Sequence, residues 1–100
     1  MKIRVVYRFL PFRYWNWIGG MVIYPFMLFK RSKEEITDRL FRHELEHVYQ
    51  VERLGWFKFY LTYIWHNVKA GYRNNPYEIE ADARANDPLT DEERKLKDNS

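Results

Sequence analysis

The sequence predicts an α+β domain in which a small β-sheet precedes several helices. Two runs of β-branched and aromatic residues, Ile3 to Leu10 and Met21 to Lys30, lie in the first third of the 100-residue chain and are typical of strands. Beyond them, apolar residues recur at the three-to-four spacing of amphipathic helices. A chain of this length folds as one domain with a modest core.

The two strand-like runs have clear boundaries. Pro11 marks the end of the first run, and Gly19 and Gly20 give the second run a flexible entry. Pro25 lies inside the second run, and a strand tolerates proline mainly when it is an edge strand. We therefore expect a small N-terminal sheet or hairpin with the second run at its edge, packed on the helix that follows.

The most apolar stretch, residues 14–29, is too short for a transmembrane helix. A span needs about 20 residues, whereas this stretch has sixteen and contains Asn16, two glycines and Pro25. A signal peptide is not expected, because basic residues are scattered as far as Arg13 and no small-residue cleavage site follows. Peripheral membrane contact through Trp15 and Trp17 stays open.

The charge and the absence of cysteine narrow the chemistry. Residues 1–33 contain seven Lys or Arg and no acidic residue, although the net charge of the whole chain is only +3. Such a face suits acidic peptides, anionic lipid or nucleic acid, and a solvated rim explains it equally well. Without cysteine there are no disulfides or thiolate metal sites, which favours a cytoplasmic location and leaves histidine and carboxylate as the strong metal ligands.

A long helix is predicted to begin directly after Ser32 and to end at Leu54. Ser32 is a suitable N-cap, Glu34 and Glu35 fall in the first turn where the helix dipole favours acidic groups, and Gly55 ends the helix. Its buried face is traced at three-to-four spacing by Ile36, Leu40, His43, His47 and Gln50 or Val51.

Residues 43–47 of this helix form the motif H-E-x-x-H. Two histidines four residues apart project from the same helix face, so His43 and His47 can reach one metal ion. Glu44 lies about 100° around the helix from His43, beside the metal, where a carboxylate can act as a general base. Glu46 is expected to be a surface carboxylate paired with Arg42. A metal-free pair of core histidines is the alternative.

A second helix, residues 76–85, supplies the third ligand. Asn75 is a good N-cap and Pro76 suits the first helical position. Catalytic zinc sites have three protein ligands and one open position, and Glu78 is the candidate that completes the set. Asp82, one turn later, is placed to accept a hydrogen bond from the outer N–H of His43.

Other ligands and nearby groups remain open. Glu80 is a reserve ligand if the second helix is rotated, and His66 competes for the third position. The turn Gly71 to Asn75 brings Tyr72 and Tyr77 near the presumed metal, where a phenol can stabilise an oxyanion, although packing is the simpler role. The aromatic run Trp56 to Val68 is predicted to be a backing helix under the motif helix and against the sheet.

H-E-x-x-H followed by a helix with E-x-x-x-D resembles the gluzincins, the zinc metallopeptidases typified by thermolysin. The small size resembles the single-domain minigluzincins, and the likeness covers residues 35–85. It implies a minimal zincin-like fold and a Zn²⁺ ion bound by His43, His47 and Glu78. It also implies that Glu44 acts as base and acid, that Asp82 supports a histidine, and that the second strand-like run pairs with an extended peptide.

The C-terminal residues differ in composition from the rest of the chain, because they carry many charges of both signs and no aromatic side chain. We expect residues 1–87 to form the domain and residues 88–100 to form a charged segment. A capping box at Thr90 to Glu93 permits a short helix from Asp91 to Lys97, but its few apolar residues favour disorder. Some minigluzincins are latent, and that resemblance implies that Asp87 to Leu96 could lie across the cleft.

The expected function is hydrolysis of peptide bonds in extended or unfolded chains by a monomeric zinc enzyme without a nucleic-acid partner. The alternative is a zinc-containing module whose cationic, aromatic N-terminal part binds anionic membrane or nucleic acid. Glu44→Gln separates the two, since it should abolish turnover in an enzyme and leave binding by a module unchanged.

Overall fold

The fold is described from a computed structural model, in which residues 3–9 and 19–99 are described. Its strands are β1 (Arg4–Val6), β2 (Gly20–Ile23) and β3 (Phe26–Phe29), and its helices are α1 (Asp38–Leu54), α2 (Trp56–Ala70), α3 (Pro76–Arg84) and α4 (Asp91–Asp98). Short 3₁₀ turns lie at η2 (Lys33–Glu35) and η3 (Tyr72–Asn74). The predicted α+β class is therefore confirmed. Trp15 and Trp17, the predicted membrane contacts, lie outside the described residues.

The described sheet has the strand order β1-β3-β2, with β1 parallel and β2 antiparallel to β3. The prediction of one strand from Met21 to Lys30 was wrong, because β2 and β3 form a hairpin through this region. Pro25 lies in the turn of the hairpin, where its missing N–H is not needed for strand pairing. β2 is nevertheless an edge of the described sheet. The first predicted strand is also shorter than expected, and Arg8 adopts the left-handed region with φ 57°.

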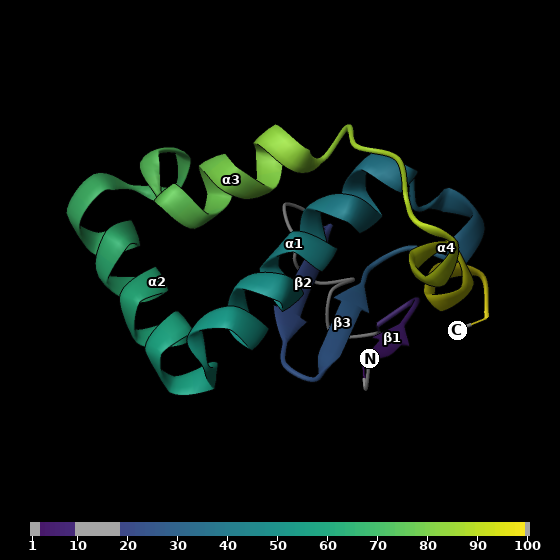
Figure 1. The fold of residues 1–100 in the computed structure, drawn as a ribbon, viewed down its shortest axis with the longest axis horizontal. Coiled ribbons are helices and arrows are strands. Elements are labelled where there is room, and N and C mark those ends of the chain that lie inside the picture. Colours follow the sequence, from purple (N-terminus) through teal and green to yellow (C-terminus); the bar gives the residue numbers. More distant parts are fainter. Residues whose placement is uncertain (1–2, 10–18, 100) are drawn as a thin grey trace.

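The core lies between the sheet and α1, which crosses the sheet in Figure 1. Phe29 of β3 stacks on Tyr7 at 5.6 Å and on Phe41 of α1 at 5.8 Å between ring centres. Leu45 and Val48, one and two turns further along α1, have no exposed surface. The sheet therefore packs on the face of α1 that carries Phe41, Leu45 and Val48, whereas His43 and His47 lie on another face of the helix, toward α3.

Helix α1 begins later than predicted. Ile36 is extended and buried, and it separates η2 from α1. Thr37 is the N-cap, since its hydroxyl accepts a hydrogen bond from the Leu40 N–H at 3.1 Å. The Ser32 hydroxyl, the predicted cap, donates to the Glu35 carboxylate at 2.8 Å instead. The predicted end is confirmed, because Gly55 has φ 89° and follows Leu54 directly.

Helix α2 is not the predicted backing helix. In Figure 1 it leaves the end of α1 at an angle and extends away from the sheet. Among its residues only Phe59 is buried. Because Gly55 alone separates α1 from α2, the second helix turns sharply and runs beyond the core. Its aromatic residues therefore divide between a cavity on one side and solvent on the other.

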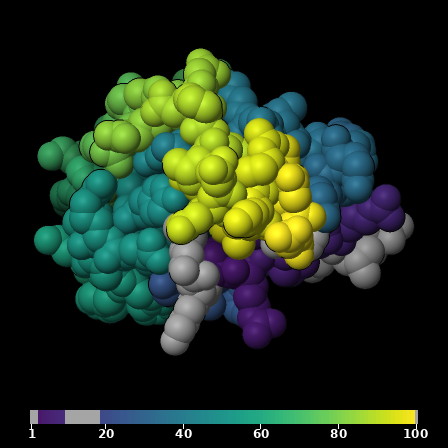
Figure 2. Space-filling model, turned by 45° about the vertical axis from the view of Figure 1, so that its right-hand side comes forward, coloured from purple at the N-terminus to yellow at the C-terminus, as the bar shows by residue number. Residues whose placement is uncertain are grey.

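The segment predicted to be disordered forms α4, which packs near the start of α1 and beside β1. Figure 2 shows its yellow residues against the purple N-terminal segment, and the Tyr7 hydroxyl donates to the Lys97 carbonyl at 2.8 Å. Arg94 and Lys97 both pair with Asp38, and Arg42 pairs with Glu93. Ion pairs thus supply the contacts that the sparse apolar residues of α4 cannot.

Candidate metal centre

Three side chains from two helices meet at the middle of the molecule. The Nε2 atoms of His43 and His47, from α1, lie 3.1 Å and 3.2 Å from Oε1 of Glu78, from α3. One nitrogen or oxygen from each residue lies within 4.8 Å of the other two. The side chains are only 12%, 7% and 4% exposed, respectively. The three predicted ligands are therefore brought together, as the spacing in the sequence predicted.

The spacing of these atoms fits a metal ion. Bonds of 2.0–2.2 Å in tetrahedral geometry place ligand atoms about 3.3 Å apart. The separations between each imidazole and the Glu78 carboxylate are within a few tenths of an ångström of that value. Two neutral imidazoles and one carboxylate fill three positions and leave a fourth free. The site is therefore able to hold a divalent metal ion with an open coordination position.

Each of the three side chains is oriented by one further residue. Nδ1 of His43 lies 2.9 Å from the Asp82 carboxylate, as predicted. Nδ1 of His47 donates to the Gln50 side-chain oxygen at 2.8 Å. The Tyr63 hydroxyl of α2 donates to the second oxygen of Glu78. Both histidines thereby turn Nε2 toward the shared position, which is the arrangement that metal-binding histidines have.

Gln50 joins the centre to the packing of α3 on α1. It has no exposed surface, and its amide N–H₂ donates to the Tyr77 carbonyl at 3.0 Å and to the Glu80 carboxylate at 2.8 Å. Arg53 binds the same Glu80 oxygen at 3.1 Å. Glu80, the reserve ligand, is thus engaged away from the three ligand atoms and is not a member of the cluster. The sequence spacing of Gln50, three residues after His47 on the same face, was the signal for its role.

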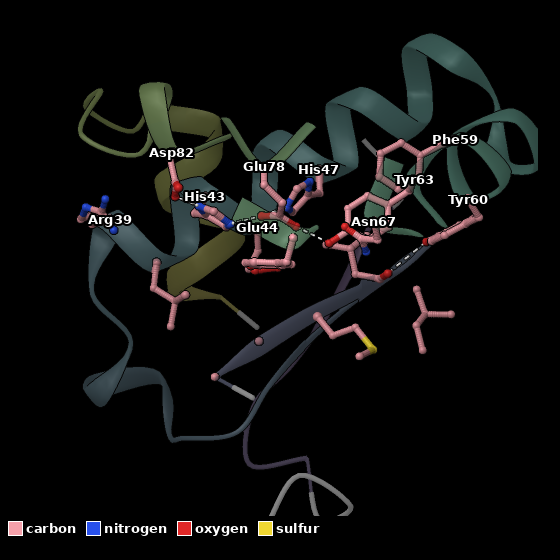
Figure 3. A pocket seen from close by; sticks show the side chains of 17 residues that line it. Arg39, His43, Glu44, His47, Phe59, Tyr60, Tyr63, Asn67, Glu78 and Asp82 are labelled. Carbon is pink, nitrogen blue, oxygen red and sulfur yellow. Dashed lines mark hydrogen bonds and ion pairs between the residues drawn. The ribbon is translucent and has the colours of Figure 1, made fainter. Parts of the chain in front are cut away.

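Glu44 lies beside the cluster and is 6% exposed. Burial raises the pKa of its carboxyl above the ordinary value, although the neighbouring His47 and His43 oppose the rise. A carboxylate with a raised pKa is a stronger base, which is what proton transfer near neutral pH requires. Figure 3 shows Glu44 close to His43 and Glu78, on the cavity side of α1.

Gly20 of β2 lets the strand come close to this carboxylate. A Cβ atom at Gly20 would lie 3.2 Å from Cγ of Glu44 and 3.1 Å from the ring of Phe29. These distances are shorter than ordinary van der Waals contact, so a side chain here would push β2 away from α1. The glycine predicted as a flexible entry therefore sets the approach of the strand to the site.

The charges of the cluster are strongly coupled when no metal is bound. Burial alone would raise the pKa of Glu78, but hydrogen bonds from His43 and His47 outweigh it and hold that pKa well below the usual range. Burial likewise opposes the charged form of His47, yet the hydrogen bond to Glu78 raises its pKa to about 9. A protonated imidazole next to the carboxylate thus takes the place of the cation.

A cavity of about 860 Å³ opens onto the cluster. Figure 3 shows Arg39 and Asp82 at one end, Phe59 and Tyr60 at the other, and Glu44 between them. The strand β2 borders it along Gly20 to Ile23, and α2 contributes Phe59, Tyr60, Tyr63 and Asn67. The cluster is therefore reached from a cleft between the sheet edge and α2.

Of the two tyrosines predicted to face the metal, Tyr72 lines the cavity and Tyr77 does not. The Tyr77 hydroxyl hydrogen-bonds to Thr62 at 2.8 Å, and its ring packs 5.2 Å from that of Phe59. Tyr77 therefore has a packing role. For Tyr72, burial and then the charge of Glu78 raise the pKa, so this phenol keeps its proton and can donate a hydrogen bond.

The remaining predicted residues lie outside the cleft. His66 packs against the ring of Tyr77 at 5.7 Å and is not part of the cluster. Glu46 pairs with Arg42 at 3.2 Å as predicted, but its side chain is only 7% exposed and is not at the surface. Asp87 to Leu96, expected from the resemblance to cover the cleft, contribute nothing to its lining, because ion pairs hold α4 near the start of α1.

Comparison with protein-family models, with curated proteins and with solved structures gives no match to this chain. The site is therefore interpreted from its own geometry. Within the described part of the chain, no helix combines the length and apolarity needed to cross a bilayer.

Proposed function

We propose that the protein is a zinc metallopeptidase that cleaves extended peptide chains. The observation that carries this proposal is the convergence of His43, His47 and Glu78 beside the buried Glu44, at the floor of an open cleft. Two imidazoles, one carboxylate and a free position form the ligand set of catalytic zinc sites in peptidases. A purely structural zinc site would have four protein ligands and no need of the adjacent base.

The residues of the site divide into groups that hold the ion and groups that move protons. When bound by His43, His47 and Glu78, zinc would supply Lewis-acid chemistry that acidifies a water molecule and polarises a carbonyl. Glu44 accepts the proton of the attacking water and returns it to the nitrogen of the leaving amine. Tyr72, which lines the cavity and keeps its proton, would donate a hydrogen bond to the developing oxyanion.

The edge strand β2 supports an extended substrate. The Val22 carbonyl points away from β3, since it accepts a hydrogen bond from the Tyr60 hydroxyl of α2 at 3.0 Å, and a peptide that pairs at Val22 would displace this phenol. Because backbone groups alternate along a strand, Gly20 faces the same way. A peptide that adds to this edge as a further strand would lie along the cleft and pass the cluster. This favours unfolded or flexible chains over folded ones.

The test combines metal analysis with digestion of a broad peptide library by the full chain. We expect one zinc ion per chain and cleavage that stops on chelation. Glu44→Gln should keep the metal and lower kcat by 10²- to 10⁴-fold, the usual contribution of acid–base catalysis. Glu52→Gln, an exposed change on the same helix, is the matched control and should leave the rate unchanged.

Two results would contradict the proposal. Stoichiometric metal without cleavage of any peptide by the unaltered chain would indicate a metal-containing binding module. Metal-free protein that retains the fold would indicate a core histidine pair held by Glu78.

A further inference from the structure

The outer side of α2 carries a row of large apolar side chains that are exposed in the described part of the chain. These are Phe57, Leu61, Ile64, Trp65 and Val68, which are 70%, 58%, 60%, 60% and 79% exposed. Single exposed apolar residues are normal on protein surfaces, whereas five adjacent ones mark an interaction site. We call them the outer stripe of α2.

The outer stripe forms one face of the helix. At 100° per residue, its five members fall within about 100° of one another around the axis, and they extend about 16 Å along it. The cavity-lining residues Phe59, Tyr63 and Asn67 lie on the other side of α2. A partner on the outer stripe would therefore leave the cleft open.

The charge around the stripe has one sign. No acidic residue occurs between Glu52 and Glu78, whereas Lys58 and Lys69 lie next to the stripe on α2 and Arg73 follows the helix. Lys58, Lys69 and Arg73 are all exposed. The Lys69 ammonium lies 6.0 Å from the centre of the Trp65 ring, at the border between the apolar and basic parts. The surface is thus apolar in the middle and positive at its side.

We propose that the outer stripe of α2 docks on the surface of an anionic membrane. An amphipathic helix with Trp, Phe and Leu on one face and Lys beside them lies in the plane of the bilayer interface, with its apolar side chains among the acyl chains. The lysines would meet the anionic headgroups of such a surface, which attract basic side chains. Trp65, with its amphipathic ring, suits the headgroup level.

The charge pattern argues against a second copy of the chain as the occupant. Two antiparallel α2 helices joined at the centre of their stripes would bring Lys58 of one copy toward Lys69 of the other. Like charges placed together in this way are destabilising, and no acidic residue of α2 relieves them. An anionic surface meets the same lysines with opposite charge.

The experiment is co-sedimentation of the full chain with vesicles of phosphatidylcholine alone and of phosphatidylcholine with 30% phosphatidylserine. We expect binding to the anionic vesicles that weakens as salt rises, and little binding to the neutral ones. The double variant Ile64→Gln with Val68→Gln should bind at least tenfold more weakly. Ile79→Gln is the matched control, because Ile79 is 54% exposed on α3 and lies outside the stripe.

Several outcomes would overturn the proposal. Absence of binding to anionic vesicles at low salt would do so, as would equal binding by the double variant and the control. A dimer in solution that the double variant abolishes would assign the stripe to a second copy. A large loss of thermal stability in the double variant would show that the stripe is buried against the chain itself. Because none of these measurements involves hydrolysis, they are separate from the test of the proposed peptidase.

Discussion

The residues that orient the three ligands differ greatly in how far water reaches them. Gln50, behind His47, has no exposed surface, whereas the Asp82 side chain, behind His43, is 62% exposed. A buried hydrogen bond has no water to replace it when one partner is removed, and an exposed one does. The two histidines therefore depend on their supports to different degrees.

We predict that Gln50→Leu lowers metal affinity 10- to 100-fold, the range typical of residues that support metal ligands. Asp82→Asn should have a smaller effect, because the amide oxygen can still accept from Nδ1 and water reaches the site. Competition against a chromophoric chelator measures both affinities. Equal losses in the two variants would show that burial of the support does not matter.

Local spacing explains which site residues could be found from the sequence. His43 and His47, and likewise Glu78 and Asp82, are pairs four residues apart on one helix, so each pair shares a face in any fold. Tyr63 reaches Glu78 from α2 only because of the angle between α2 and α1, which no local pattern encodes. Tyr77 was misplaced because it precedes Glu78 by one residue and so faces a different side of α3.

At the scale of elements, the sequence predicted whether a segment forms a helix or a strand better than it predicted where that segment begins and ends. The cap of α1 was wrong because Ser32 and Thr37 are both good caps, and burial of Ile36 decides between them. A single strand was expected where β2 and β3 form a hairpin, since the run is apolar throughout. The prediction of disorder at α4 undervalued ion pairs that come from α1, more than 50 residues away in the sequence.

The docking of α4 should depend on pH through Asp38. Hydrogen bonds from Arg94 and Lys97 lower the pKa of Asp38 from 3.8 to about 2. Because the folded pKa is the lower one, its contribution is complete above about pH 4 and is lost as the pH falls toward 2. Its size is less than about 1 kcal/mol, since the carboxylate is half exposed.

Hydrogen exchange of the amides in α4, followed from pH 5 to pH 2, measures this release. We expect protection to fall in that window while protection in the middle of α1 persists. Asp38→Asn is the control and should lower protection already at pH 5, with a weaker dependence on pH. Unchanged protection of α4 down to pH 2 would show that its packing does not need the ion pairs.

At the scale of the whole molecule, the metal centre connects α1 and α3, which the hydrophobic core alone does not hold together. The main core lies between α1 and the sheet and contains no residue of α3, whereas the contacts of α3 with α1 include the hydrogen bonds of Gln50 and of the two histidines. A ligand that binds only the folded state adds RT ln(1 + [L]/Kd) to the free energy of unfolding. Metal bound by Glu78 and the two histidines should therefore stabilise the whole fold.

We predict that chelation lowers the melting temperature. With free metal at 1,000 times its Kd, the loss is about 4 kcal/mol, which for a domain of this size corresponds to roughly 15–30 °C. The Kd at a given pH already includes competition from a proton, because His47, with its pKa raised to about 9, is protonated at pH 7 in the metal-free chain and pairs with Glu78. At a fixed metal concentration the shift should therefore grow as the pH rises toward 9 and level off above it, where the imidazolium is lost and metal no longer competes with a proton. Calorimetry with and without chelator measures this shift in melting temperature.

Glu78→Gln, which removes the carboxylate ligand, is the control and should melt at a temperature that the chelator does not change. A metal-loaded chain that melts identically after chelation would contradict the link between the metal centre and the stability of the fold.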